Sequence, residues 1–118
     1  MSLPKLRGRV PSAKVSGMNR LEAAYADRLT LLLHTHNIAA WWYQPLKFRL
    51  ADRTYYTPDF LVQRCDGTLE LHETKGWMRD DANVKLKVTA ALYWLFPVYL
   101  VKQTRGAWDI RQVETTPS

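Results

Sequence analysis

Three charged residues, Asp59, Glu73 and Lys75, stand at a spacing that could support hydrolysis of a phosphodiester bond. Asp59 lies within the run Tyr-Thr-Pro-Asp-Phe at 56–60, and the run Glu-Thr-Lys at 73–75 begins fourteen residues after it. Alternate side chains of a β-strand share a face, so Glu73 and Lys75 should point the same way. Antiparallel pairing with the preceding strand can bring Asp59 beside them. The pattern therefore predicts one cluster of two carboxylates and an ammonium group.

Two neighbouring carboxylates favour a cation between them, and hard oxygen ligands prefer Mg²⁺ or Mn²⁺ to softer metals. We therefore expect Asp59 and Glu73 to bind a divalent ion. The ion would polarise a scissile phosphate and acidify a water, while Lys75 would orient that water and offset charge developing on phosphorus. Two alternatives exist: Asp59 could be a turn carboxylate at a strand end, and Glu73 with Lys75 a surface ion pair worth under about 1 kcal/mol.

The elements that must position these residues form a predicted α/β domain. Apolar spacing predicts a helix from Asn19 to about His36, and Asn19 with Glu22 resembles a capping box. Strands are expected at 41–50, 54–63 and 69–75, a helix at 80–96, and strands at 98–102 and 108–113. The expected core stripe of the second helix is Val84, Val88, Ala91, Leu92 and Leu95. We expect a flexible basic arm at 1–17, one domain at 18–113 and a polar tail at 114–118.

Pro58-Asp59 followed by Glu73-Thr74-Lys75 resembles the PD-(D/E)XK signature of restriction-endonuclease-like nucleases, which include Holliday-junction resolvases. The wider pattern resembles a phage-encoded, uncharacterised branch and the endonuclease subunit of a heteromeric transposase; it comprises Asn-Arg-Leu-Glu at 19–22, Gln-Pro at 44–45 and His72 to Gly76. The resemblance spans about residues 18–101. It implies an α-β-β-β-α-β core in which a mixed sheet is flanked by helices. It also implies a Mg²⁺- or Mn²⁺-dependent endodeoxyribonuclease, with branched or junction DNA of phage DNA processing or recombination among its substrates.

The resemblance also implies a fuller active site. In that family a glutamate on the first helix often joins the metal site, and Glu22 is the matching position. The backbone carbonyl of the middle residue of the third-strand motif, here Thr74, is often a ligand as well. The implied catalytic set is Asp59, Glu73, Lys75 and Glu22, and the implied metal set is Asp59, Glu73, Thr74 and Glu22. Helix capping explains Glu22 equally well without a metal.

The charge balance favours a polyanionic partner, with DNA as the first candidate. The chain carries 17 Lys+Arg against 11 Asp+Glu, a net charge of +6. The candidate DNA contacts are Lys5, Arg7, Arg9, Lys14, Arg20, Gln44, Lys85 and Lys87. The basic arm could equally be a solubilising leader, and Lys85 and Lys87 could be snorkelling lysines of an amphipathic helix. A homodimer is expected if the substrate is a junction, because resolution requires two active sites at a fixed spacing.

Two functions of other classes stay open. The chain could be a DNA-binding or recruitment module that keeps a nuclease fold but is inactive or acts only within a larger complex. It could also be a partner-binding protein that uses its apolar and aromatic surface. Trp41, Trp42 and Tyr43 could stack on exposed bases, but aromatic residues in strands are more often part of a core or interface. His34, His36, His72 and Cys65 lack the spacing of a known zinc module. His72 should project away from the face of Glu73 and serve packing or hydrogen bonding.

The chain also lacks signals for export or membrane insertion. Its single cysteine, Cys65, excludes an internal disulfide. The basic N-terminal stretch is not followed by an apolar run of signal-peptide length, and the longest apolar run, at 90–101, is too short to cross a bilayer. We therefore expect a cytoplasmic protein, located in the bacterial host if a phage encodes it.

Overall fold

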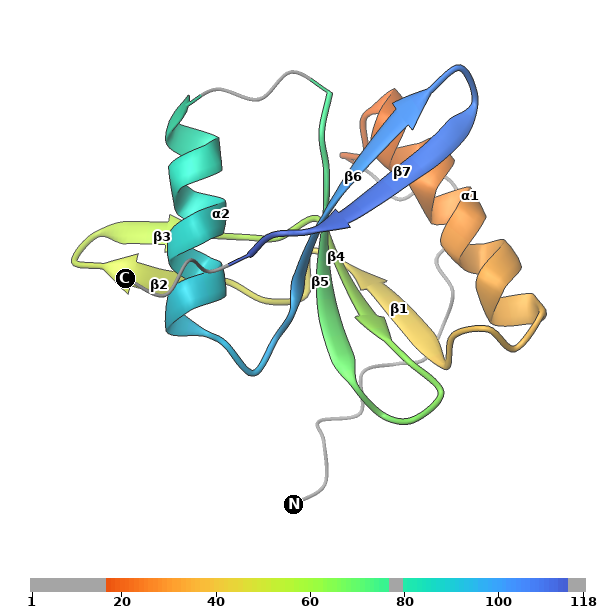
Figure 1. Cartoon of the computed structure of the whole chain (residues 1–118), viewed down its shortest axis with the longest axis horizontal. Coiled ribbons are helices and arrows are strands. Elements are labelled where there is room, and N and C mark those ends of the chain that lie inside the picture. Colours follow the sequence, from red (N-terminus) through yellow and green to blue (C-terminus); the bar gives the residue numbers. More distant parts are fainter. Residues whose placement is uncertain (1–16, 77–79, 115–118) are drawn as a thin grey trace.

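The computed structural model describes residues 17–76 and 80–114 of the 118-residue chain. Its elements are helix α1 (Arg20–His34), strands β1 (Ala40–Tyr43), β2 (Phe48–Ala51), β3 (Thr54–Tyr56), β4 (Phe60–Gln63) and β5 (Leu69–Thr74), helix α2 (Asp80–Leu92), and strands β6 (Val98–Thr104) and β7 (Ala107–Gln112) (Figure 1). The α/β class is confirmed. Of the expected terminal segments, residues 1–16 and 115–118 lie outside the described residues, including Lys5, Arg7, Arg9 and Lys14.

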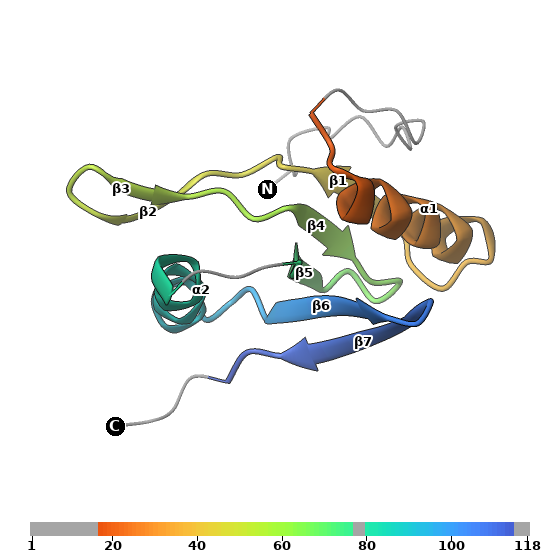
Figure 2. The same cartoon turned by 90° about the horizontal axis from the view of Figure 1, so that it is seen from above.

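A mixed five-stranded sheet forms the centre of the fold. Its strand order is β1-β4-β5-β6-β7, with β5 and β6 parallel and the other neighbours antiparallel. The chain between β5 and β6 contains α2, as a parallel pair requires a crossover. Both faces of strand β4 are buried: Phe60 and Val62 pack in the cluster that includes α1, and Leu61 packs in the cluster that includes α2. Figure 2 shows strands separating the two helices.

The two predicted strands at 41–50 and 54–63 pair with each other, but each is divided into two. β1 and β4 belong to the main sheet, while β2 and β3 form a separate two-stranded hairpin. The first break contains Gln44, which has a positive φ of 48°, followed by Pro45. The second contains Pro58, whose missing N–H prevents a continuous ladder. The hairpin consequently leaves the sheet and extends past α2 (Figures 1 and 2).

The predicted core stripe of α2 is wrong. Val84, Leu92 and Leu95 are 57%, 54% and 70% exposed, whereas Leu86 and Thr89 are 1% and 0% exposed. The buried face follows Leu86, Thr89, Ala90 and, just beyond the helix, the half-buried Tyr93. Apolar residues occur on both faces of this helix, so periodicity alone selected the wrong one. The buried face packs against the sheet and also supports the hairpin, a contact that helical spacing does not encode.

Membrane insertion through a helix has no support in the described part of the chain. Neither α1 nor α2 is long and apolar enough to cross a bilayer.

Candidate active site

The pairing of β4 with β5 brings Asp59 beside Glu73. Phe60 is the register partner of His72, so Asp59, one residue before β4, lies opposite Glu73. The Asp59 backbone N–H donates to Glu73 Oε1 at 3.0 Å. The Asp59 carbonyl accepts from the Gln44 N–H at 2.8 Å, which ties this turn to the end of β1. The expected meeting of Asp59 with Glu73 is therefore observed.

Thr74 fixes the side chain of Asp59. Asp59 Oδ2 accepts from the Thr74 N–H at 2.9 Å and from Thr74 Oγ1 at 2.7 Å. One oxygen of each carboxylate is thus held by these bonds, and the second oxygens, Asp59 Oδ1 and Glu73 Oε2, take no part in them. The sequence pointed only to the backbone carbonyl of Thr74 and missed the role of its hydroxyl and N–H. The sequence signal that could have suggested this role is the threonine that directly follows Glu73.

The two carboxyl groups are costly to ionise together. The pKa of Asp59 rises from 3.8 to about 8, first because burial penalises the charge, then because Glu73 repels it, with Glu22 adding to the rise. Burial also raises the pKa of Glu73, while the Tyr56 hydroxyl and the bond from Asp59 N–H oppose that rise. The Tyr56 hydroxyl itself is buried and lacks a partner of regular hydrogen-bond geometry. Negative charge at this point would be stabilised by a cation.

Glu22 lies at the same site and also caps its helix. Its Oε1 accepts from the Asn19 N–H at 2.9 Å and from Tyr43 Oη at 3.2 Å, and the Asn19 side chain accepts from the Glu22 N–H, completing the predicted capping box. The pKa of Tyr43 is raised to about 12, first by burial and then by the nearby charge of Glu22. A cavity of about 470 Å³ is lined by Asn19, Arg20, Leu21, Glu22, Asp59, Glu73, Thr74 and Gly76. Capping and a place at this cavity are therefore compatible.

The donor chemistry of the cavity fits a divalent cation. No group of three His, Cys, Asp or Glu side chains within the described ranges is placed to hold a metal ion by itself. Mg²⁺ is commonly held by one or two carboxylates and completes its six ligands with water and substrate phosphates. Asp59 and Glu73 supply two such carboxylates, with Glu22 on the same cavity wall. The pKa of Asp59 is raised first by burial and then by repulsion from Glu73, so a cation between the two groups would favour ionisation of both.

The other predicted site residues do not all lie at the cavity. Lys75 donates its backbone N–H to the Val101 carbonyl at 2.7 Å, but none of the ion pairs formed between described residues includes its ammonium group, and it does not line the cavity. Arg20 lines the cavity. Gln44 approaches through its backbone, and its side chain is exposed. Lys85 Nζ donates to the Tyr55 carbonyl at 3.3 Å, and Lys87 is exposed.

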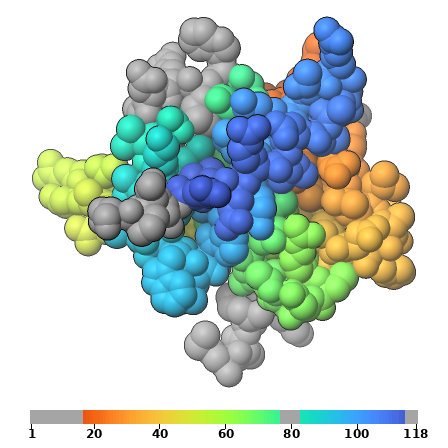
Figure 3. All heavy atoms as spheres, viewed as in Figure 1, coloured from red at the N-terminus to blue at the C-terminus, as the bar shows by residue number. Residues whose placement is uncertain are grey.

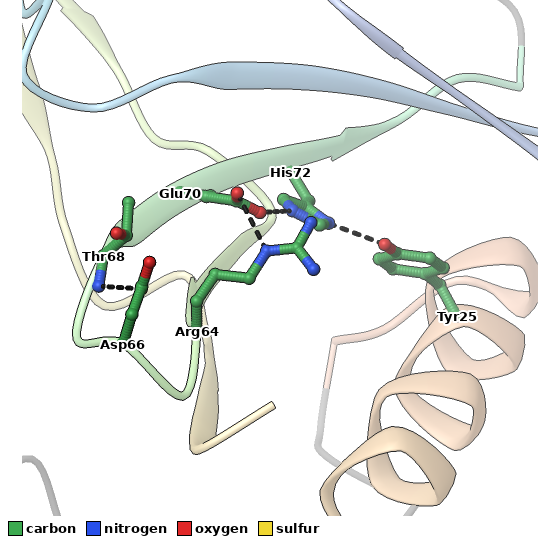
Figure 4. A network of polar contacts seen from close by, with 6 residues as sticks. All are labelled: Tyr25, Arg64, Asp66, Thr68, Glu70 and His72. Carbon is green, nitrogen blue, oxygen red and sulfur yellow. Dashed lines mark hydrogen bonds and ion pairs between the residues drawn. The ribbon is translucent and has the colours of Figure 1, made fainter. Parts of the chain in front are cut away.

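His72 lies on the other face of β5, as predicted, in a buried polar network (Figure 4). One ring nitrogen, Nδ1, is 2.6 Å from Tyr25 Oη, and the other, Nε2, is 3.0 Å from Glu70 Oε1. Arg64 Nε donates to Glu70 Oε2 at 2.9 Å. Burial raises the pKa of Tyr25 beyond the usual range of tyrosine, so its hydroxyl is a poor nucleophile. The network therefore joins α1 to β5 and satisfies buried polar groups.

Comparisons with known proteins give no match to a protein-family model, a curated protein or a solved structure.

Proposed function

We propose that this chain is a divalent-metal-dependent endodeoxyribonuclease of the PD-(D/E)XK type. One observation carries the proposal: Asp59 and Glu73 lie together at a cavity with Glu22 on its wall, and the pKa of Asp59 is raised to about 8 by burial and by Glu73. Placing two partly buried carboxyl groups side by side lowers the stability of the fold, so a binding or catalytic role explains the pair better than packing does. Perturbed carboxylates in a cavity are typical of functional sites.

The arrangement of elements supports the same proposal. α1 is followed by the antiparallel strands β1, β4 and β5, then by α2 and the parallel strand β6, with helices on both faces of the mixed sheet. This is the order α-β-β-β-α-β once the β2–β3 hairpin is treated as an extension of β1 and β4. We therefore also propose that these elements form a nuclease-like core.

Each residue then has a defined task. Asp59, Glu73 and the Thr74 carbonyl would hold the metal, with Glu22 as a further carboxylate. When bound, the ion supplies Lewis-acid stabilisation of charge on the scissile phosphate. The Thr74 hydroxyl and N–H orient Asp59, and the Asp59 N–H orients Glu73. Lys75, which follows β5 on the strand face of Glu73, would orient the attacking water.

A panel of DNA substrates tests the proposal. Purified protein is incubated with supercoiled, linear, single-stranded and four-way-junction DNA in Mg²⁺, in Mn²⁺ and in EDTA. We expect cleavage of at least one substrate in Mg²⁺ or Mn²⁺, none in EDTA, and loss of cleavage in Asp59→Asn and Lys75→Ala. Absence of cleavage from the whole panel, or cleavage that both variants retain, would reject it.

A DNA-binding module without cleavage is the second candidate function. It is favoured by the position of Lys75, which forms none of the ion pairs found between described residues and lies outside the lining of the cavity. Calorimetry separates the two functions. A nuclease should bind Mn²⁺ in a manner that Glu73→Gln abolishes, whereas a binding module requires no such site.

A further inference from the structure

The β2–β3 hairpin presents a basic outer face. Phe48 and Tyr56 are register partners and are buried, while Arg49 and Tyr55 are the next partners and are exposed. Lys47 is exposed as well, and its Nζ lies 4.6 Å from the centroid of the Tyr55 ring. Arg53 occupies the turn with a φ of 57°. We call Lys47, Arg49, Arg53 and Tyr55 the outer face of the hairpin.

The hairpin is held in place by α2 and the chain just beyond it. The Phe48 and Tyr93 rings lie 4.6 Å apart, and Tyr93 Oη donates to the Arg49 carbonyl at 2.5 Å. Lys85 Nζ donates to the Tyr55 carbonyl. Figure 3 shows the hairpin, in yellow-green, standing out from the edge of the molecule. Its cations are thus carried on a supported scaffold, which lowers the entropic cost of binding.

The base of the hairpin reaches the carboxylate pair. Asp59 follows Tyr56 by three positions. At the other end of the hairpin segment, the Gln44 N–H donates to the Asp59 carbonyl at 2.8 Å, so both strands of the hairpin connect to the chain at the candidate active site. The hairpin that carries the outer face therefore extends from the candidate active site.

The hairpin and the residues around it carry an excess of positive charge. Residues 44–57 contain Lys47, Arg49 and Arg53 against the single acid Asp52. Asp52 is 3.6 Å from Arg49, but both side chains are largely exposed, so the pair is weak. A phosphate backbone is repelled by Asp59 and Glu73 and needs cations alongside them to approach.

We propose that the outer face of this hairpin binds the phosphate backbone of duplex DNA next to the bond to be cut, with Lys47, Arg49 and Arg53 contacting phosphates. The inference rests on the proposed function for the identity of the partner. It places a DNA contact on a segment where the sequence motifs predicted none.

A matched pair of double variants tests this. The first, Arg49→Gln with Arg53→Asn, removes two charges from the hairpin, and the Arg49 carbonyl stays available to Tyr93. The control, Arg111→Gln with Arg105→Asn, removes two charges from the β6–β7 hairpin. Arg111 is likewise exposed and 3.9 Å from an aspartate, and Arg105 likewise occupies a turn with a φ of 52°. Asparagine suits both positive-φ positions.

Binding of a fluorescent duplex is measured in EDTA over a range of salt concentrations, after thermal unfolding has shown both variants to be folded. We expect the hairpin variant to raise Kd at least about tenfold at 0.1 M salt and to lower the salt slope by about 2, because each lost phosphate contact removes about 0.9 from it. The control should stay within about threefold of the unaltered protein.

An unchanged Kd and slope in the hairpin variant, or an equal loss in the control, would overturn the inference. Because binding is measured without metal, it is independent of cleavage. Binding that depends on the hairpin, with no cleavage of any substrate, would reject the proposed function and uphold the DNA contact. Metal-dependent cleavage together with binding that ignores the hairpin would reject the DNA contact alone.

Discussion

Replacing Asp59 by asparagine should stabilise the protein at alkaline pH. The introduced side chain could still accept the N–H and the hydroxyl of Thr74 through its amide oxygen, and its NH₂ group would remove the repulsion from Glu73. The pKa of the Asp59 carboxyl rises from 3.8 to about 8 in the fold. A rise of that size costs the ionised state at most about 6 kcal/mol, at about 1.4 kcal/mol for each tenfold change in the equilibrium. Because the group borders a cavity open to water, we expect a gain of about 2 kcal/mol.

The sign of the pH dependence follows from the raised pKa. Below pH 3.8 the carboxyl is protonated in both states, so Asp59→Asn should change little. As the pH rises from about 4 to about 8, the unfolded chain is ionised and the folded chain resists ionisation, so the native protein loses stability relative to the variant. Above about pH 8 the difference should be constant.

Urea unfolding in EDTA at pH 4 and pH 8.5 measures this difference in the free energy of unfolding. Asp109→Asn is the control, because the Asp109 side chain is 55% exposed. Mn²⁺ should reduce the advantage of Asp59→Asn, since a metal at 100 times its Kd stabilises the unaltered protein by about 2.7 kcal/mol. A variant that is no more stable at pH 8.5, or whose gain is the same at both pH values, would refute the reasoning.

Three further outcomes are expected. Glu22→Gln should weaken Mn²⁺ binding in calorimetry and keep the helix cap, whereas Glu22→Ala should also lower the free energy of unfolding by about 1 kcal/mol; normal Mn²⁺ binding by the Gln variant would leave Glu22 as a cap alone. Tyr56→Phe should raise the pKa of Glu73, because the hydroxyl lowers it, and should move the acidic limb of the pH–rate profile of cleavage to higher pH; an unchanged or lower limb would contradict this. His72→Ala should cost about 2–4 kcal/mol in urea unfolding, because it leaves the buried Glu70 without one partner, and should keep cleavage per folded molecule within about twofold; a selective loss of cleavage by folded protein would contradict this.

Short-range sequence patterns were enough to predict much of the candidate site. The Asn19 and Glu22 capping box depends on residues three apart, and strand alternation correctly separated Glu73 from His72. Antiparallel pairing of neighbouring strands predicted that Asp59 could lie beside Glu73, as the register of β4 and β5 shows. These features depend on short-range geometry, which the sequence encodes directly.

Features that depend on packing between distant elements were not predictable. The Tyr25–His72 contact joins residues 47 positions apart, and no local pattern marks Tyr25 as its partner. The buried face of α2 was misassigned because the hairpin and the sheet, not the helix alone, select it. The Lys75 side chain follows the end of β5, so strand alternation gives its face but not its place relative to the cavity.

The dependence of plasmid nicking on Mn²⁺ tests the central claim most directly. The initial rate of nicking of supercoiled DNA is measured against Mn²⁺ concentration for the unaltered protein and for Glu73→Gln. We predict a saturable rise for the unaltered protein and a rate at least about 100-fold lower for Glu73→Gln at every concentration. An unaltered protein that does not nick at any Mn²⁺ concentration, or a Glu73→Gln variant that nicks at the unaltered rate, would contradict a metal-dependent nuclease centred on Asp59 and Glu73.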